Sequence, residues 1–164
     1  MILLLLLLAS CGPRIDPVVP GFRAPDAPIY SSAVVETARL SGHWVQVAGF
    51  AAGGQAVCGP GSVDFDGGDF DGGAVRWDLC LADGRHNGAG PLVPGKPGRF
   101  GVAGMADWWV LWVDGDYRTL VIGTPSGAFG FVLNRDAGMP GDRLQAVRDI
   151  VRFNGYDPAN MAVF

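Results

Sequence analysis

Residues 40–50, with the sequence LSGHWVQVAGF, decide the fold of this chain. After His43 the side chains alternate between two faces, and this period of two predicts a β-strand. One face carries Trp44, Gln46, Ala48 and Phe50, and the other carries Val45, Val47 and Gly49. A Gly-x-Trp sequence that opens such a run, here Gly42-His43-Trp44, is typical of the floor of a closed β-barrel.

The composition favours one domain built from short strands. Of the 164 residues, 49% are apolar and 17% are charged, which suffices for one sizeable core. The 26 glycines and 12 prolines favour frequent chain reversals over long helices. The net charge of −4 and a single lysine, Lys96, leave no basic surface for phosphates, which argues against nucleic-acid binding.

Residues 1–10 are predicted to be a signal peptide. The apolar run at 1–8 is too short to span a bilayer, and it ends in Leu8-Ala9-Ser10-Cys11. This sequence resembles a bacterial lipoprotein signal, which implies cleavage before Cys11 and a lipid anchor there. Gly12, where aspartate would retain the chain at the inner membrane, suggests the periplasmic face of the outer membrane. An ordinary secretory signal, with Cys11 free or paired, is the alternative.

Residues 11–40 are predicted to tether the domain. Five prolines between Gly12 and Pro28 predict an extended polyproline-like spacer of about 50 Å, at about 3.1 Å per residue. One short helical turn is expected between 31 and 40, before a domain that covers 41–164.

Six further β-runs follow the first one, with turn residues between several of them. They are predicted at 62–66, 74–82, 100–104, 108–114, 118–124 and 129–135. A series of strands without an intervening helix argues for an antiparallel up-and-down meander, and closure into a barrel would remove its edge strands. An amphipathic helix is then expected from Pro140 to Gly155, with its apolar face against the outside of the barrel, and a last short strand at 161–164.

Three motifs in order make the chain resemble a lipocalin, close to the bacterial outer-membrane lipoproteins of that family. They are Gly42-x-Trp44, the turn Asp116-Tyr117, and Arg135 at the end of its β-run. The resemblance implies an all-β fold, an eight-stranded antiparallel up-and-down barrel with one C-terminal α-helix packed outside. It also implies that Arg135 covers the indole of Trp44 at the closed end, so that both residues are structural.

Ligand contacts are expected at the other end of the barrel. In 108–113 one face carries Trp108, Val110 and Trp112, and in 129–135 the matching inward set includes Phe129 and Phe131. We predict that these five residues line a cavity, with Trp108, Trp112 and Phe131 foremost. The alternatives are that the aromatic side chains fill a solid barrel, or that the helix covers a tryptophan on the outside.

Cys58 and Cys80 are predicted to form a disulfide, since an even pair in an oxidising periplasm is most simply bridged. No metal is expected, because His43 and His86 have no ligands at suitable spacing. The tandem Asp-Phe-Asp-Gly-Gly sequence at 64–73 matches no EF-hand loop, so an acidic turn is favoured over a Ca²⁺ site.

The predicted function is binding rather than catalysis, without a cofactor. No Gly-x-Ser-x-Gly nucleophile elbow occurs, and Asp114, Asp116 and Asp136 are better explained as turn residues. The resemblance implies a membrane-anchored carrier of a small hydrophobic or amphiphilic ligand such as a fatty acid or lysophospholipid. Arg99 or Arg118 could meet an anionic head group, although a solvated surface arginine is the favoured interpretation of both. The alternatives are a structural envelope lipoprotein with a filled barrel and a lipocalin-fold enzyme acting on a bound lipid.

Overall fold

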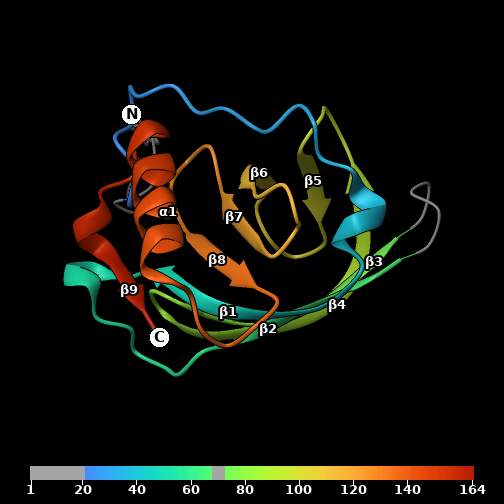
Figure 1. The fold of residues 1–164 in the computed structure, drawn as a ribbon, viewed down its shortest axis with the longest axis horizontal. Coiled ribbons are helices and arrows are strands. Elements are labelled where there is room, and N and C mark those ends of the chain that lie inside the picture. Colours follow the sequence, from blue (N-terminus) through green and yellow to red (C-terminus); the bar gives the residue numbers. More distant parts are fainter. Residues whose placement is uncertain (1–20, 68–72) are drawn as a thin grey trace, which may run out of the picture.

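The computed structural model describes residues 21–67 and 73–164, and these form a closed β-barrel with one helix outside it (Figure 1). The predicted signal peptide and Cys11 lie outside the described residues, as does part of the Asp-Phe-Asp-Gly-Gly repeat. The strands are β1 (Gly42–Phe50), β2 (Ser62–Asp66), β3 (Ala74–Leu81), β4 (Gly84–Pro94), β5 (Arg99–Val102), β6 (Trp108–Val113), β7 (Thr119–Gly123), β8 (Gly130–Asn134) and β9 (Met161–Val163).

Every strand from β1 to β8 pairs with its sequence neighbour in the antiparallel sense, and β1 also pairs with β8. This last pairing closes the eight-stranded up-and-down barrel that the sequence predicted. The ninth strand is the predicted one at the C-terminus, and it pairs with the second half of β1. Before the barrel, the expected helical turn is present as a short 3-10 helix, η1 (Thr37–Leu40), at the right of Figure 1.

The longest strand, β4, was missing from the predicted series. Its sequence, GRHNGAGPLVP, has no alternation of apolar and polar residues, so nothing in it indicates a strand. It becomes one because β3 pairs with it residue by residue, from Ala74 with Pro91 to Leu81 with Gly84. The strand structure of β4 therefore follows from its pairing with β3, because its own sequence pattern does not indicate a strand.

Two β-bulges change which side chains point into the barrel. The register of β1 shifts between Gln46 and Ala48, and that of β6 shifts between Val110 and Trp112. A bulge adds one residue to a strand, so every side chain after it moves to the opposite face. Trp44 faces the interior, whereas Ala48 and Phe50, which a strict period of two places on the same face, lie outside, in the layer between the barrel and the helix.

The same effect makes the prediction for Trp112 wrong. Trp108 and Val110 precede the bulge and belong to the interior core, but Trp112 packs in the outer layer and is partly exposed. A strict period of two over 108–113 places all three residues on one face. The extra residue, Leu111, breaks that period, and the alternative of a tryptophan outside the barrel is the one that the structure shows for position 112.

The helix α1 (Gly141–Phe153) packs on the outside of the barrel, where its buried Val147 and Val151 meet the outer layer (Figure 1). It ends at Phe153, and Gly155 provides the predicted stop just beyond the cap residue, because the chain there adopts a positive φ of 82° that glycine tolerates best. The amide of Tyr156 then donates to the carbonyl of Val151, which closes the last turn. Within the described ranges, no helix has the length and apolarity that a membrane crossing requires.

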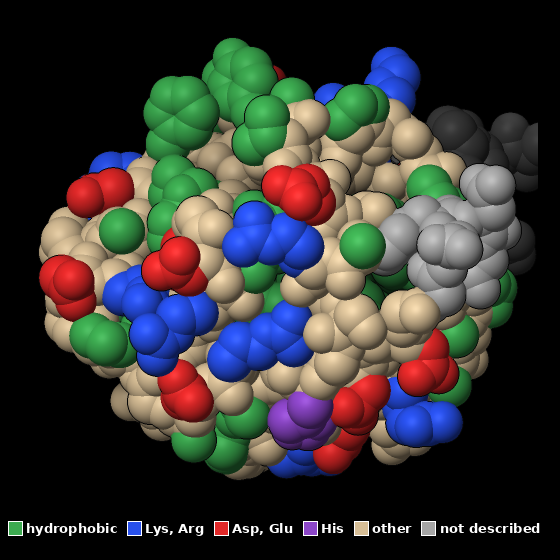
Figure 2. Space-filling model, turned by 45° about the vertical axis from the view of Figure 1, so that its right-hand side comes forward, with side chains coloured by type: hydrophobic (Ala, Val, Ile, Leu, Met, Phe, Trp, Pro, Cys, Tyr) green, Lys and Arg blue, Asp and Glu red, His purple; other side chains and the backbone are tan. Residues whose placement is uncertain are grey.

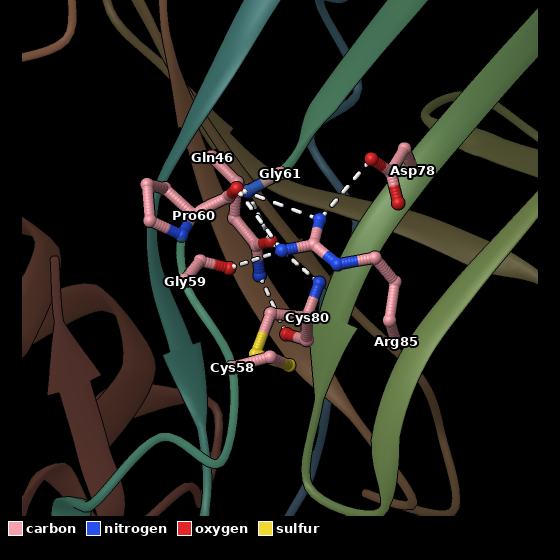
Figure 3. A network of polar contacts seen from close by, with 8 residues as sticks. All are labelled: Gln46, Cys58, Gly59, Pro60, Gly61, Asp78, Cys80 and Arg85. Carbon is pink, nitrogen blue, oxygen red and sulfur yellow. Dashed lines mark hydrogen bonds and ion pairs between the residues drawn. A yellow bond between two sulfur atoms is a disulfide. The ribbon is translucent and has the colours of Figure 1, made fainter.

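A disulfide and several polar contacts hold the β1–β2 loop, residues 51–61, against β3 and β4 (Figure 3). The predicted disulfide between Cys58 and Cys80 is present, with its Cα atoms 5.7 Å apart. Beside it, the guanidinium of Arg85 on β4 pairs with Asp78 at 3.1 Å and donates to the carbonyl of Gly59 at 2.9 Å. The buried amide of Gln46 bonds both backbone groups of Cys80 at 2.8 Å, which joins β1 to β3.

Candidate functional site

The three sequence motifs meet at one end of the barrel and close it. The guanidinium of Arg135 lies 3.8 Å from the centre of the Trp44 ring, where the sequence predicted it. It also donates to the backbone carbonyls of His43 at 3.1 Å and Arg39 at 2.9 Å. Gly42 is required beneath it, since its φ is 100° and a Cβ there would lie 3.2 Å from a guanidinium nitrogen.

The Asp-Tyr motif contributes a second aromatic ring to the closed end. Tyr117 is buried, and its hydroxyl accepts from the amide of Glu36 at 2.7 Å. The guanidinium of Arg39 covers this ring at 3.9 Å, just as Arg135 covers Trp44. Figure 2 shows this side of the molecule, where basic and acidic side chains alternate across the surface. At the closed end, two arginines each cover an aromatic ring and link it to the neighbouring backbone.

Aromatic side chains fill the interior of the barrel. The ring of Trp108 meets three other rings edge-on. The distances between ring centroids are 5.1 Å to Phe131, 6.1 Å to Trp77 and 6.4 Å to Phe65. Trp108 and Phe131 are at most 1% exposed, so no water-sized space adjoins them. The indole N–H of Trp108 has no hydrogen-bond partner among the described residues. Of the two alternatives left open by the sequence, these residues match the filled core.

The open end of the barrel holds an apolar pocket of about 410 Å³, called the mouth pocket below. Its walls come from the β3–β4, β5–β6 and β7–β8 loops and from Phe22, whose amide donates to the carbonyl of Gly127 at 2.8 Å. The lining residues are Phe22, Leu81, Ala82, Asp83, His86, Gly104, Met105, Ala106, Ala128 and Phe129. This volume lies within the range of small-molecule sites in proteins, about 300–1,000 Å³.

The five residues predicted to line a cavity are only partly brought together. Phe129 lies in the mouth pocket, and its ring stacks on that of Phe131 at 6.1 Å. Phe131, Trp108 and Val110 lie deeper in the filled core, and Trp112 lies outside the barrel. A ligand in the mouth pocket would therefore touch Phe129. The ring of Phe129 is supported from below by Phe131 in the filled core.

Neither arginine proposed for an anionic head group lines the mouth pocket. Arg99 stacks on Trp109 at 3.6 Å on the outside of the barrel, and Arg118 pairs with Asp136 at 3.1 Å at the closed end. Phe22, Leu81 and Met105 line the pocket but were not predicted from the sequence. Leu81 could have been found as the last large apolar residue of its β-run, but Phe22 belongs to the predicted tether and Met105 to a glycine-containing loop.

Tyr156 supports the mouth pocket from the outer layer. Its buried hydroxyl accepts from the amide of Thr124 at 2.8 Å and donates to the carbonyl of Phe129 at 2.9 Å. Burial away from water raises the pKa of Tyr156, because it disfavours the phenolate. In the described parts of the chain, no three histidine, cysteine or acidic side chains come together as metal ligands.

The comparisons with known proteins agree with this geometry. A lipocalin-like domain family matches residues 97–164. Among solved structures, the siderocalin Ex-FABP, described as functioning through dual ligand specificities, superposes with a TM-score of 0.59 at 15% identity, over 77% of this chain and 93% of that one. The cockroach allergen Per a 4 superposes with a TM-score of 0.59 at 9% identity, over 85% and 94%.

No curated protein matches the chain in sequence. At these identities the two structures establish the fold alone, and the family match concerns the C-terminal part of the chain. The structure itself indicates the same fold. It has a closed barrel, an arginine that covers Trp44 and a helix packed outside. The chain has the lipocalin fold, and its residues 97–164 match a lipocalin-like domain family.

Proposed function

We propose that this protein is a carrier that holds a small hydrophobic or amphiphilic molecule in the mouth pocket. The observation that carries the proposal is the pocket itself, about 410 Å³ of space walled by phenylalanine, leucine, methionine and alanine at the open end of a lipocalin barrel. Burying apolar surface contributes roughly 25 cal/mol per Å², so such walls favour apolar ligands. Although His86 and Asp83 line the pocket, no serine, threonine or cysteine nucleophile among the described residues does, which favours carriage over catalysis.

The resemblance to bacterial outer-membrane lipoproteins adds the cellular setting to this proposal. Lipid attached at Cys11 would anchor the protein at the periplasmic face of the outer membrane, and its ligand would be a fatty acid or a lysophospholipid. Residues 21–22, at the start of the described chain, lie against the β7–β8 loop instead of extending away from the barrel, and Phe22 lines the pocket, which supports an anchor attached on this side. The anchor would then hold the open end within reach of the membrane.

Native mass spectrometry of protein purified from its own cells tests the proposal. A bound lipid that survives purification, together with a mass increase on the N-terminal peptide at Cys11, is the expected result. A protein that is always empty and does not take up any added lipid would overturn the carrier role. A modified lipid product would instead show an enzyme.

A structural envelope protein is the second candidate, and the filled interior favours it. Trp108, Phe131 and Trp77 occupy the space that a ligand would need deeper in the barrel. On this alternative, the mouth pocket would be too shallow to retain a ligand. The two candidates predict opposite results for saturable binding of a small apolar probe at the open end.

A further inference from the structure

The N-terminal strap, residues 21–30, supplies one wall of the mouth pocket from outside the barrel. In Figure 1 it is the blue trace that passes α1 before it runs across the top of the view. Its Phe22 lines the pocket, and the ring lies 6.0 Å from that of Phe50 in the outer layer. The other described lining residues belong to strands and loops of the barrel, so the position of Phe22 alone depends on a segment outside it.

The next residue, Arg23, is buried where three segments meet. Only 8% of it is exposed, although its guanidinium is charged. The guanidinium donates to the carbonyl of Asn154 at the end of α1 at 2.8 Å and to that of Pro125 in the β7–β8 loop at 2.9 Å. It also donates to the carbonyl of Ala27 within the strap. A planar group with five N–H donors can reach three carbonyls in different directions, as no other side chain can.

The surroundings of Arg23 belong to the elements that build the rest of the pocket. Gly127 in the β7–β8 loop has a φ of 69°, and a Cβ there would collide with the Cβ of Arg23. On its other side, Arg23 forms an isolated β-bridge with Tyr156, whose hydroxyl donates to the carbonyl of the lining residue Phe129. Arg23 therefore joins the strap to the same two segments that hold Phe129.

Little else buries the strap. Five of the seven residues from Ala24 to Tyr30 are exposed. A segment with few buried side chains opens at a lower free energy than the core of the protein. The bonds made by the buried Arg23 therefore largely decide how often the strap, and Phe22 with it, is docked on the barrel.

We propose that Arg23 is the positioning residue of the mouth pocket, which holds the strap docked and thereby sets the ligand affinity through Phe22. The proposal rests on the proposed carrier function and concerns how the same pocket is kept closed. Arg23 does not line the pocket, so it acts through Phe22 and not by contact with the ligand. Release of the strap removes one wall and opens a way out for the ligand.

Titration of the uncharged fluorescent probe N-phenyl-1-naphthylamine into variants of the full chain tests the proposal. Phe22→Ala should weaken probe binding about tenfold, the effect of losing roughly 50 Å² of apolar contact. Arg23→Ala should weaken it by a similar factor, although every lining residue is unchanged. In the double variant the two losses should not add, because no phenylalanine is left for Arg23 to position.

Arg135→Ala separates positioning from a general loss of stability. This control also removes an arginine that donates to backbone carbonyls, but at the closed end, and it should keep the probe affinity of the unmodified protein. Unchanged affinity in Arg23→Ala, an equal loss in Arg135→Ala, or losses that add in the double variant would each overturn the proposal and leave the carrier function intact. Absence of saturable binding to the unmodified protein would overturn both.

Amide hydrogen exchange of the unmodified protein tests the same coupling where Arg23→Ala does not fold. A ligand that prefers the docked strap must stabilise docking by the factor by which docking strengthens binding. The amides of Phe22 and Ala24, which donate to Gly127 and Gly155, should therefore exchange about tenfold more slowly at saturating probe. Exchange rates at these two amides that do not respond to the probe would contradict the proposal.

Discussion

At the scale of single residues, Arg135 connects three parts of the chain that are far apart in sequence. Its guanidinium lies on the Trp44 ring and bonds carbonyls of η1 and of β1. Partial burial lowers the pKa of Arg135, yet an arginine stays charged at any pH at which the protein is folded. The residue therefore acts as a permanent cationic cap on the barrel.

Replacing Arg135 with alanine should lower the melting temperature and leave the affinity for the probe unchanged. Loss of the cation–π contact and of charged hydrogen bonds costs about 2 kcal/mol, or roughly 4–8 °C in melting temperature for a chain of this size. Thermal melting and probe titration of Arg135→Ala measure the two effects. Arg118→Ala, which removes an exposed arginine paired with Asp136, is the control and should melt close to the unmodified protein. An unchanged melting curve for Arg135→Ala would contradict this account of the cap.

Because of Tyr156, we expect the free energy of unfolding to fall as pH rises in the alkaline range. Because its pKa is raised above the usual value near 10, the folded state keeps a proton that the unfolded state loses. Stability is then fully present below about pH 10 and falls as pH rises towards the folded-state pKa. Denaturant unfolding at about pH 9 and about pH 11 should show this loss in the unmodified protein and a smaller one in Tyr156→Phe. An identical pH dependence in both proteins would exclude Tyr156 as the cause.

The residues that the sequence predicted well are those whose role depends on a local motif. Gly42, Trp44, Tyr117 and Arg135 lie where the ordered motifs place them. Trp112 does not, because its face depends on a bulge that inserts Leu111, and no turn residue or glycine marks that insertion in the sequence. A motif fixes a position in the chain, whereas a period of two holds only as long as the strand is regular.

At the scale of elements, the β1–β2 loop is held by its disulfide more than by a core. In its 3-10 helix, η2 (Ala52–Gly54), no residue is buried, and the loop is held by the bridge to Cys80, by Arg85 of β4 and by the bond from Gly61 to Gln46. Removing the bridge with Cys58→Ser and Cys80→Ala should destabilise the protein by about 3 kcal/mol, chiefly through the greater freedom of the unfolded chain.

Denaturant unfolding with and without a reducing agent measures this contribution. The unmodified protein should lose stability on reduction, and the double cysteine variant should not respond to the reducing agent. Probe affinity should stay the same throughout, because no residue of 51–61 lines the mouth pocket. Two free thiols in the non-reduced protein would contradict the bridge.

The elements also show where sequence patterns stop being informative. The β-runs with apolar alternation and the helix between Pro140 and Gly155 were predicted close to their observed bounds. β4 was not predicted, since its glycines and prolines indicate turns when taken alone. Its structure follows from the edge of β3, which offers a complete set of hydrogen-bonding groups to the chain that returns from the two-residue turn.

At the scale of the whole molecule, the barrel separates stability from binding. The closed end and the aromatic interior hold the fold, and the open end leaves a largely apolar pocket. The pocket could not be predicted from the sequence, because its walls combine the tether with three loops that are distant in the chain. Only closure of the barrel brings these segments together.

The most direct test of the carrier function is a titration of N-phenyl-1-naphthylamine into the protein and into Ala128→Trp. Ala128 is exposed at the pocket, so an indole there should fill the space without disturbing the core. Ala137→Trp, at an exposed position between β8 and α1, is the matched control. Saturable binding that is lost in Ala128→Trp and kept in Ala137→Trp, with similar melting of all three proteins, is predicted. Equal binding by all three, or no saturable binding by any, would contradict a ligand site at the mouth of the barrel.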